Sequence, residues 1–278
     1  MAVDLHTHST RSDGTDEPAR LVALARSLGL RALGLTDHDT LDGIPAARAA
    51  AAGTSLELVP GVELSVDWEA GPAHFLAYWI EPGAGPLQDS LAELAAGRAQ
   101  RNAEILGALA DLGMDLSLEE LRPTPGLVGR PHIAAALVRH GHVPSVEAAF
   151  DLYLARGRPA YRPRRRLTAA EAVDLTRRSG GAAVLAHPHT VAAGAAAYAA
   201  ALEAFAALGG AGVECHYPDY PPELQEHLAA VTRRLGMAPT GGSDYHGDHR
   251  PGISLGTGRG DLRVPDAAVE ELRLRRPT

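Results

Sequence analysis

The chain of 278 residues contains one cysteine, Cys215. A single cysteine excludes an intramolecular disulfide framework and fits a reducing compartment. Apolar runs of the roughly 18–20 residues that cross a bilayer are also missing, and the N-terminus becomes polar within six residues. We therefore expect no secretory signal, no membrane association and a cytoplasmic location.

Basic side chains are in the minority, with 26 Lys and Arg against 34 Asp and Glu, for a formal net charge of −8. A surface of this charge does not attract nucleic acid as a whole. An anionic substrate would have to be drawn in locally, by a metal or by clustered arginines. The hydrophobic content of 45% is enough for a full core, in one large or two small domains.

Short apolar runs of strand type alternate with helical patterns, which is typical of an α/β fold with parallel strands. A helix is expected from about Glu17, with Asp16 as its cap, Pro18 in its first turn and Gly29 at its end. We expect about seven strands, at residues 2–5, 32–36, 56–64, 74–80, 182–186, 211–215 and 237–241.

The alternation stops between residues 82 and 165, where helical patterns take over. A long amphipathic pattern covers residues 87–113, and further helices are expected near 131–140 and 145–155. We predict a barrel domain made of residues 1–81 and 166–278. The insertion at 82–165 is predicted to be an all-helical cap over the site rather than an independent domain.

Many histidines and carboxylates follow directly after predicted strands, at the face where barrel enzymes keep their chemistry. Imidazole and carboxylate donors without a thiolate suit Mn, Fe or Zn rather than Mg alone. They are too many for one ion, so we expect a cluster of two or three, which can activate water and stabilise the leaving oxygen of a phosphoester. These residues are His6, His8, Asp37, His38, Glu63, His187, Glu214, His216, Asp244 and His246, with His74 at the start of the fourth strand.

Each motif has a structural explanation when it stands alone. His-x-His can belong to an exposed face of a strand, "TDHDT" at 36–40 can form a turn, and His132 behind Pro131 can begin a helix. A purely structural interpretation would need all of these residues to meet on one barrel face by accident. Four further histidines have no supporting context and are interpreted as surface residues: His140, His142, His227 and His249.

Six motifs resemble those of the polymerase and histidinol phosphatase (PHP) superfamily of metal-dependent phosphoesterases. They are "DLHTHSTRSDGT", "GLTDHDT", "PGVELS", "GRPHIA", "VLAHPH" and "GGSDYHG", and they extend from residue 4 to about residue 247. The helical insertion and the last motif are most similar to the bacterial branch that includes 3′,5′-nucleoside bisphosphate phosphatases and 5′-to-3′ exoribonucleases. The resemblance implies an α/β fold, a distorted (β/α)7 barrel with an all-helical insertion.

The resemblance also implies a cluster of three metal positions, in which Glu63 bridges two of the ions. Manganese is the expected metal, with zinc or iron as alternatives. The implied ligands are His6, His8, Glu63 and Asp244 for the first ion, Glu63, His74 and His132 for the second, and Asp13, His38 and His246 for the third.

We expect His187 and Asp37 to be the catalytic residues, with His187 as a further ligand or as the group that protonates the leaving oxygen. Asp13 favours the nucleotide-acting branch, because histidinol phosphatases usually have histidine at the matching position. Arg11 and His189 depart from the small residues that are usual at their positions.

Phosphate recognition favours arginine, whose planar fork can hold two oxygens at once. Arg130 is the first candidate, and Arg164 in the run "RPRRR" at 162–166 is the second. His216 is a third substrate-binding candidate. A solvated basic loop explains any single arginine of that run equally well.

We therefore expect a metal-dependent phosphoesterase in which metal-bound hydroxide attacks a terminal phosphate of a 3′,5′-nucleoside bisphosphate or a short 5′-phosphorylated oligonucleotide. No stable protein partner is expected. One alternative is a phosphatase of small monoesters such as histidinol phosphate, against which Asp13 and the helical cap argue. Another is a non-catalytic metal-bound module, against which the filled ligand positions and the lack of an attached polymerase argue.

Overall fold

The structure is a computed structural model that describes residues 2–69, 71–121 and 128–277. The chain divides into two compact units. The first unit contains Met1–Ser90 and Arg166–Thr278, and the second contains Leu91–Arg165. Each unit is described by itself below.

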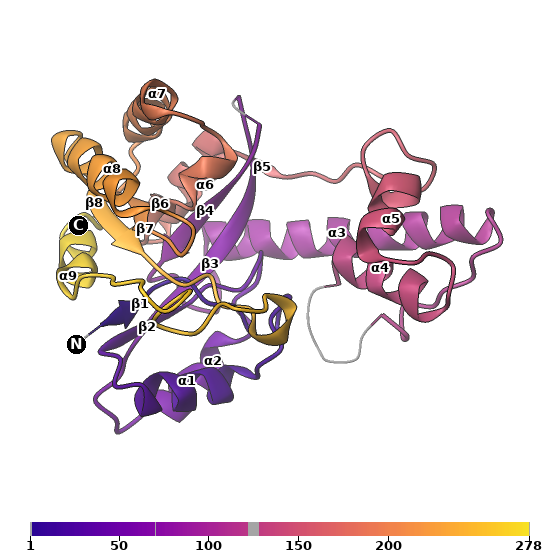
Figure 1. Ribbon diagram of the computed structural model, residues 1–278, viewed down its shortest axis with the longest axis horizontal. Helices are drawn as coiled ribbons and strands as arrows, with labels where there is room; N and C mark the ends of the chain where they lie inside the picture. Colours follow the sequence, from indigo (N-terminus) through magenta and orange to yellow (C-terminus); the bar gives the residue numbers. More distant parts are fainter. Residues whose placement is uncertain (1, 70, 122–127, 278) are drawn as a thin grey trace. The chain divides into compact units, whose positions relative to one another are not determined.

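The first unit is a twisted sheet with helices packed along it (Figure 1). Its strands are β1 (Val3–Asp4), β2 (Ala32–Leu35), β3 (Glu57–Trp68), β4 (Gly71–Tyr78), β5 (Leu167–Thr168), β6 (Ala182–Leu185), β7 (Gly212–His216) and β8 (Ala238–Gly241). Its helices are α1 (Pro18–Ser27), α2 (Ile44–Ala51), α6 (Ala169–Arg178), α7 (Ala195–Ala207), α8 (Pro222–Arg234) and α9 (Ala267–Arg273). The strand order is β1-β2-β3-β4-β6-β7-β8, and β5 pairs with β3.

The two ends of this strand order meet and nearly close the sheet. The backbone N–H of Leu5 donates to the oxygen of Gly241 at 3.2 Å, and that of Asp244 donates to the oxygen of His6 at 2.9 Å. The seven strands in this order therefore form a nearly closed barrel. The predicted distorted barrel of α/β class is confirmed, and the closing seam joins two segments that carry predicted ligands.

The prediction of parallel strands throughout was wrong for β4, which runs antiparallel to both β3 and β6. Only two residues separate Trp68 from Gly71, and a connection this short can join only antiparallel strands. Because β3 continues to Trp68, Glu63 lies inside that strand instead of closing it. His74 lies within β4, opposite Ser65, which brings it beside Glu63.

The expected cap of the first helix was also wrong. The N-cap of α1 is Glu17, and no side chain caps the helix. The carboxylate of Asp16 instead accepts a hydrogen bond from the hydroxyl of Tyr245 at 2.8 Å, which ties the start of α1 to the segment after β8. Gly29 ends the helix as expected, with φ of 69° in the left-handed region that glycine favours.

The core of the barrel unit is apolar and brings β1 close to β2. Gly34 makes this approach possible, because a Cβ at that position would lie 2.2 Å from the backbone oxygen of Leu5. The hydroxyl of the buried Tyr78 donates to the same oxygen at 2.8 Å. The cluster also contains Val3, Val59, Leu76, Val184, Val269 and Leu272.

The second unit is helical and has a core of its own. Its elements are most of α3 (Pro86–Ala110), α4 (Arg130–Arg139), α5 (Val146–Ala149) and a π-helical turn at Phe150–Leu154. Ile105, Leu109, Ile133 and Leu137 pack together in its centre. None of the helices within the described residues combines the length and the hydropathy of a transmembrane span.

Candidate metal centre

Glu63 is the common contact of the histidines at the open end of the barrel. Its side chain is only 1% exposed. The carboxylate oxygen Oε2 lies 3.3 Å from Nε2 of His6, 3.1 Å from Nε2 of His8 and 3.1 Å from Nδ1 of His38. His6 and His8 lie in the segment that follows β1, and His38 lies in the segment that follows β2.

The second carboxylate oxygen of Glu63, Oε1, faces two further histidines. It lies 2.9 Å from Nδ1 of His74 and 3.1 Å from Nε2 of His187. His187 follows β6 with φ of 24°, a strained backbone conformation of the kind that is concentrated at functional sites. Both oxygens of Glu63 are thus surrounded by imidazole nitrogens, as a carboxylate that bridges two cations requires.

Three groups of donor atoms lie close enough to hold cations. Within each group, the ligand atoms all lie within 4.8 Å of one another. The groups are His6, His8, Glu63 and Asp244; His8, Asp13, His38 and His246; and His38, Glu63 and His74. The first is a set that the resemblance implies. The second adds His8 to the implied set of Asp13, His38 and His246, and the third has His38 where the resemblance implies His132.

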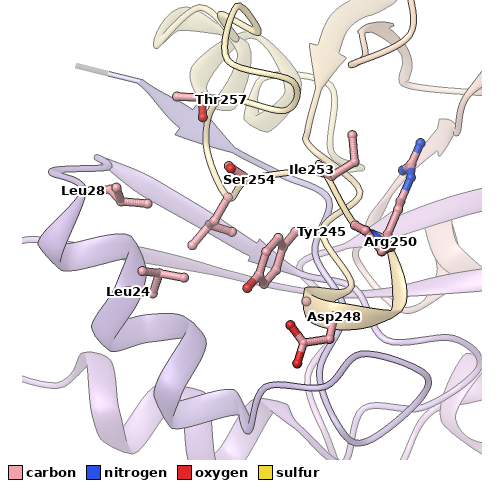
Figure 2. Close-up of a pocket in the computed structure, with 12 residues that line it drawn as sticks. Leu24, Leu28, Tyr245, Asp248, Arg250, Ile253, Ser254 and Thr257 are labelled. Atoms are coloured by element: carbon pink, nitrogen blue, oxygen red, sulfur yellow. The ribbon is translucent and has the colours of Figure 1, made fainter.

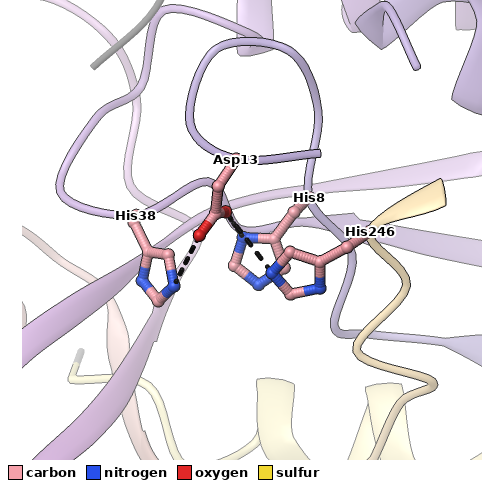
Figure 3. A group of neighbouring side chains, drawn as sticks. All are labelled: His8, Asp13, His38 and His246. Carbon is pink, nitrogen blue, oxygen red and sulfur yellow. Dashed lines mark ion pairs between the residues drawn. The ribbon is translucent and has the colours of Figure 1, made fainter. Parts of the chain in front are cut away.

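Asp13 points between three of these rings (Figure 3). Its Oδ2 lies 3.6 Å from Nε2 of His38, and its Oδ1 lies 3.3 Å from Nε2 of His246 and 3.6 Å from Nδ1 of His8. The rings of His8 and His246 stack with their centroids 4.0 Å apart. This group joins side chains from three separate parts of the barrel.

The donor set fits divalent cations. Nδ1 of His38 and Oδ1 of Asp13 are buried and have no hydrogen-bond partner among the described residues, although each lies close to a group of opposite charge. The Nε2 atoms of His6 and His8 lie 3.1 Å apart and both face Glu63. Buried polar atoms without a hydrogen-bond partner are costly, and a cation that they coordinate would remove this cost.

Without a bound metal, the negative carboxylates of this site favour protonated histidines. Burial lowers the pKa of His8, but hydrogen bonds to Asp244 and Glu63 outweigh burial and raise it to about 10. Burial lowers the pKa of His38 to about 4. Burial opposes ionisation of Glu63, yet the surrounding histidines hold its pKa well below the usual range. Cation binding would therefore displace protons.

Glu214 holds two residues of the cluster in place, whereas the sequence offered it only as one of many candidate metal donors. Its Oε1 accepts a hydrogen bond from Nδ1 of His6 at 3.0 Å, and its Oε2 accepts one from the backbone N–H of His187 at 2.8 Å. The carboxylate therefore fixes which nitrogen of His6 faces Glu63. The only sequence signal was its place beside His216 at the end of β7.

Asp37, the second predicted catalytic residue, is fully enclosed by a neighbouring turn. Its Oδ1 accepts hydrogen bonds from the backbone N–H of Ser9 and the hydroxyl of Ser12, both at 2.7 Å. Its Oδ2 accepts one from the hydroxyl of Ser9 at 2.6 Å. We propose that Asp37 positions the turn that carries His8 and Asp13 rather than contacting substrate.

Asp244 is held by the side chains of Tyr217 and Arg250, neither of which the sequence placed beside it. Its Oδ1 lies 3.4 Å from Nε2 of His6 and 3.3 Å from Nε2 of His8. Its Oδ2 accepts hydrogen bonds from the hydroxyl of Tyr217 at 2.8 Å and from Arg250 at 2.6 Å. Asp244 has φ of 53°, so these contacts also hold a strained backbone in place.

Arg250→Gln is expected to lower metal affinity about 10-fold, because Asp244 loses the charged group that turns Oδ1 toward the cluster. Competition with a chelator measures the affinity. Arg259→Gln is the matched control. Both arginines donate to Asp219, Arg259 at 2.7 Å and Arg250 at 3.1 Å, but among the hydrogen bonds of the described residues Arg259 has none to Asp244. Equal losses in the two variants would contradict the assignment.

Three predicted residues have local partners outside these groups. His132 accepts a hydrogen bond on Nδ1 from the N–H of Gly129 at the start of α4. Arg130 donates to the backbone oxygen of Leu154 at 3.1 Å. Nδ1 of His216 donates to Gln225 at 3.0 Å. His132, Arg130 and Arg164 belong to the second unit, and the roles of these three residues and of His216 stay predictions.

A pocket of about 550 Å³ lies between α1 and the loop that follows Asp244 (Figure 2). Leu24 of α1 and Leu28, directly after that helix, form one side, and Tyr245, Arg250 and Ile253 come from the loop. Within the described part of the chain, its lining and the three donor groups have no residue in common. The pocket is therefore a feature of the loop rather than the metal centre itself.

Comparisons with known proteins agree with this fold. Residues 4–116 match the PHP domain family. The chain is 35% identical to the 5′-3′ exoribonuclease Rnm of Salmonella typhimurium, over 91% of this chain and 87% of that protein. It is 30% identical to the 3′,5′-nucleoside bisphosphate phosphatase of Chromobacterium violaceum, over 91% of this chain and 90% of that one.

A solved structure from Bifidobacterium adolescentis, described as a metal-dependent phosphoesterase, superposes with a TM-score of 0.83 at 29% identity. The match covers 99% of this chain and 96% of that one. A nearly closed barrel that gathers histidines around one shared carboxylate agrees with this class of metal-dependent phosphoesterase. The chain belongs to the PHP domain family, which confirms the resemblance seen in the sequence motifs.

Proposed function

We propose that the enzyme hydrolyses a terminal phosphate of 3′,5′-nucleoside bisphosphates or of short 5′-phosphorylated oligonucleotides, with a cluster of two or three divalent ions. The observation that carries the proposal is the environment of Glu63, whose two oxygens contact five histidines. The relatives named as an exoribonuclease and a nucleoside bisphosphate phosphatase support the nucleotide substrate. Mn²⁺ is the metal we favour for this nitrogen and oxygen donor set, ahead of Zn²⁺ or Fe²⁺.

The first ion would be held by His6, His8, Glu63 and Asp244, whose donor atoms are the most deeply buried of the three groups. The remaining ligands are proposed to be Asp13, His38, His74 and His246, with His132 of the helical unit as a further candidate. When bound, the ions would activate water and neutralise the charge that develops on the phosphate.

His187 is proposed to protonate the leaving oxygen. Its ring nitrogen Nε2 hydrogen-bonds to Glu63 at 3.1 Å, and its backbone is fixed by Glu214. The residue is buried, with 7% of its surface exposed. General acids in this position contribute about 10²- to 10⁴-fold to a rate. Arg130, Arg164 and His216 are proposed to bind substrate phosphates.

Product analysis tests the proposed substrate. Manganese-loaded protein is incubated with 3′,5′-adenosine bisphosphate, a short 5′-phosphorylated RNA or histidinol phosphate, each with a chelated control. We expect phosphate from the bisphosphate or mononucleotides from the RNA, and complete loss of both with chelator. Turnover of histidinol phosphate alone would instead identify a phosphatase of small monoesters.

His8→Ala distinguishes an enzyme from a metal-bound structural module. The enzyme interpretation predicts loss of turnover with an unchanged circular dichroism spectrum, because His8 contributes to two of the donor groups. His142→Ala, at an exposed position of the helical unit, is the control and is expected to keep full activity. Undiminished turnover in His8→Ala would show that the ligand assignment is wrong.

A further inference from the structure

His189 is an exposed residue with a ring that is held in one orientation near the metal centre. It lies in the short helical turn Pro188–Thr190, directly after His187. Its backbone N–H donates to the hydroxyl oxygen of Tyr220 at 3.2 Å, and its Nδ1 lies 2.9 Å from the same oxygen. Because that oxygen accepts the backbone N–H, its own proton is free to go to Nδ1, and the imidazole proton is then on Nε2.

The ring of His189 is also backed by three aromatic neighbours. Its centroid lies 5.3 Å from that of Tyr217, 5.4 Å from that of Tyr220 and 5.8 Å from that of His187. Tyr217 and Tyr220 are only 4% and 6% exposed, so they support the ring without presenting faces of their own. An exposed side chain that is fixed this way is already in position for a ligand and loses little freedom on binding.

This aromatic group is continuous with the metal centre through two separate contacts. The hydroxyl of Tyr217 donates to Asp244 at 2.8 Å, and His187 hydrogen-bonds to Glu63 at 3.1 Å. His187 is thus the single ring between His189 and the bridging carboxylate. The guanidinium of Arg250 lies 5.2 Å from the centre of the Tyr217 ring, which places a cation beside the same surface.

We propose that His189 is the base-binding residue of this enzyme, on whose exposed ring the nucleobase of the substrate stacks while its phosphate lies at the metal centre. The proposal rests on the nucleotide substrate proposed above. A flat ring suits this role because every base has a π-face, so that stacking binds nucleotides without selecting one sequence. It would also favour nucleotides over phosphomonoesters that lack a base.

The test compares ligands that differ only in the base. Binding of adenosine 5′-phosphate and of ribose 5-phosphate to manganese-loaded protein is measured by calorimetry, and hydrolysis of 3′,5′-adenosine bisphosphate and of ribose 3,5-bisphosphate is measured in parallel. The variants are His189→Ala and His189→Phe, the second of which keeps a flat ring without its nitrogens. Metal content and the melting temperature are recorded for each protein.

In the native protein we expect adenosine 5′-phosphate to bind about 5- to 100-fold more tightly than ribose 5-phosphate. His189→Ala should remove most of this difference and raise KM for the bisphosphate that carries a base, with metal content and the base-free reaction unchanged. His189→Phe should retain most of the preference. Phenylalanine has no ring nitrogen, so a retained preference for the base would show that the base contacts the face of the ring.

Three results overturn the proposal: no preference for the base in the native protein, equal losses for both ligands in His189→Ala, or no recovery in His189→Phe. Failure of the proposed reaction is distinguishable from these. Base-dependent binding that needs His189, without hydrolysis of either bisphosphate, would reject the reaction and keep the binding site. Hydrolysis of both bisphosphates at equal KM would support the reaction and reject the binding site.

Discussion

Glu63→Gln is expected to lower kcat/KM for the phosphoester by about 10³-fold or more. This is the largest effect that we expect from any single substitution. Each oxygen of Glu63 faces imidazole nitrogens, with Oε2 3.1 Å from His8 and His38 and Oε1 2.9 Å from His74. An amide has the same size but offers one neutral acceptor oxygen, and it cannot bridge two cations. The measurement is steady-state kinetics together with metal content after dialysis.

The control for Glu63→Gln is Glu81→Gln. The Glu81 carboxylate is 56% exposed and pairs with Arg48, so its loss should leave activity and metal content unchanged. Full metal content and near-native turnover in Glu63→Gln would mean that the ions bind elsewhere or that Glu63 is a structural residue. Lost turnover with full metal content would place Glu63 in the reaction but not among the essential ligands.

Glu214→Gln is expected to lower metal affinity about 10- to 100-fold, the range typical of residues that orient metal ligands. Glu214 is fully buried and accepts one hydrogen bond on each oxygen, from His6 and from the backbone of His187. In glutamine one of these acceptors becomes an N–H₂ donor, which leaves either His6 or His187 facing another donor. Chelator competition measures the loss.

Glu203→Gln provides the comparison for Glu214→Gln, because Glu203 is 59% exposed and forms a distant ion pair with Arg234 at 3.8 Å. We expect no change in metal affinity there. A Glu214→Gln variant with native affinity would show that the orientation of His6 does not depend on this carboxylate. A variant that loses its circular dichroism spectrum would indicate a role in folding instead.

Most residues of the three donor groups could be predicted because they follow strands that are easy to recognise. His6, His8 and His38 come directly after short apolar runs, and a barrel brings such positions to one end. Sharing of ligands could not be predicted in the same way. His8 takes part in two donor groups because its two nitrogens face different carboxylates, at 3.1 Å from Glu63 and 3.6 Å from Asp13.

The residues that hold the ligands in place were harder to find, since their partners are distant in sequence. Glu214 lies 208 positions from His6, and Asp4, whose carboxylate accepts hydrogen bonds from the N–H and hydroxyl of Ser243, lies 239 positions from that partner. These contacts depend on closure of the barrel rather than on local pattern. The antiparallel β4 was missed for a related reason, because apolar alternation does not encode strand direction.

Anomalous diffraction from crystals of the manganese-loaded protein tests the central claim most directly, because it locates the ions without reference to activity. We predict two or three manganese peaks, with at least two of them in contact with different oxygens of Glu63 and one of them between His6, His8 and Asp244. A single peak, or peaks that leave Glu63 without a metal contact, would contradict the account of this site as a carboxylate-bridged cluster.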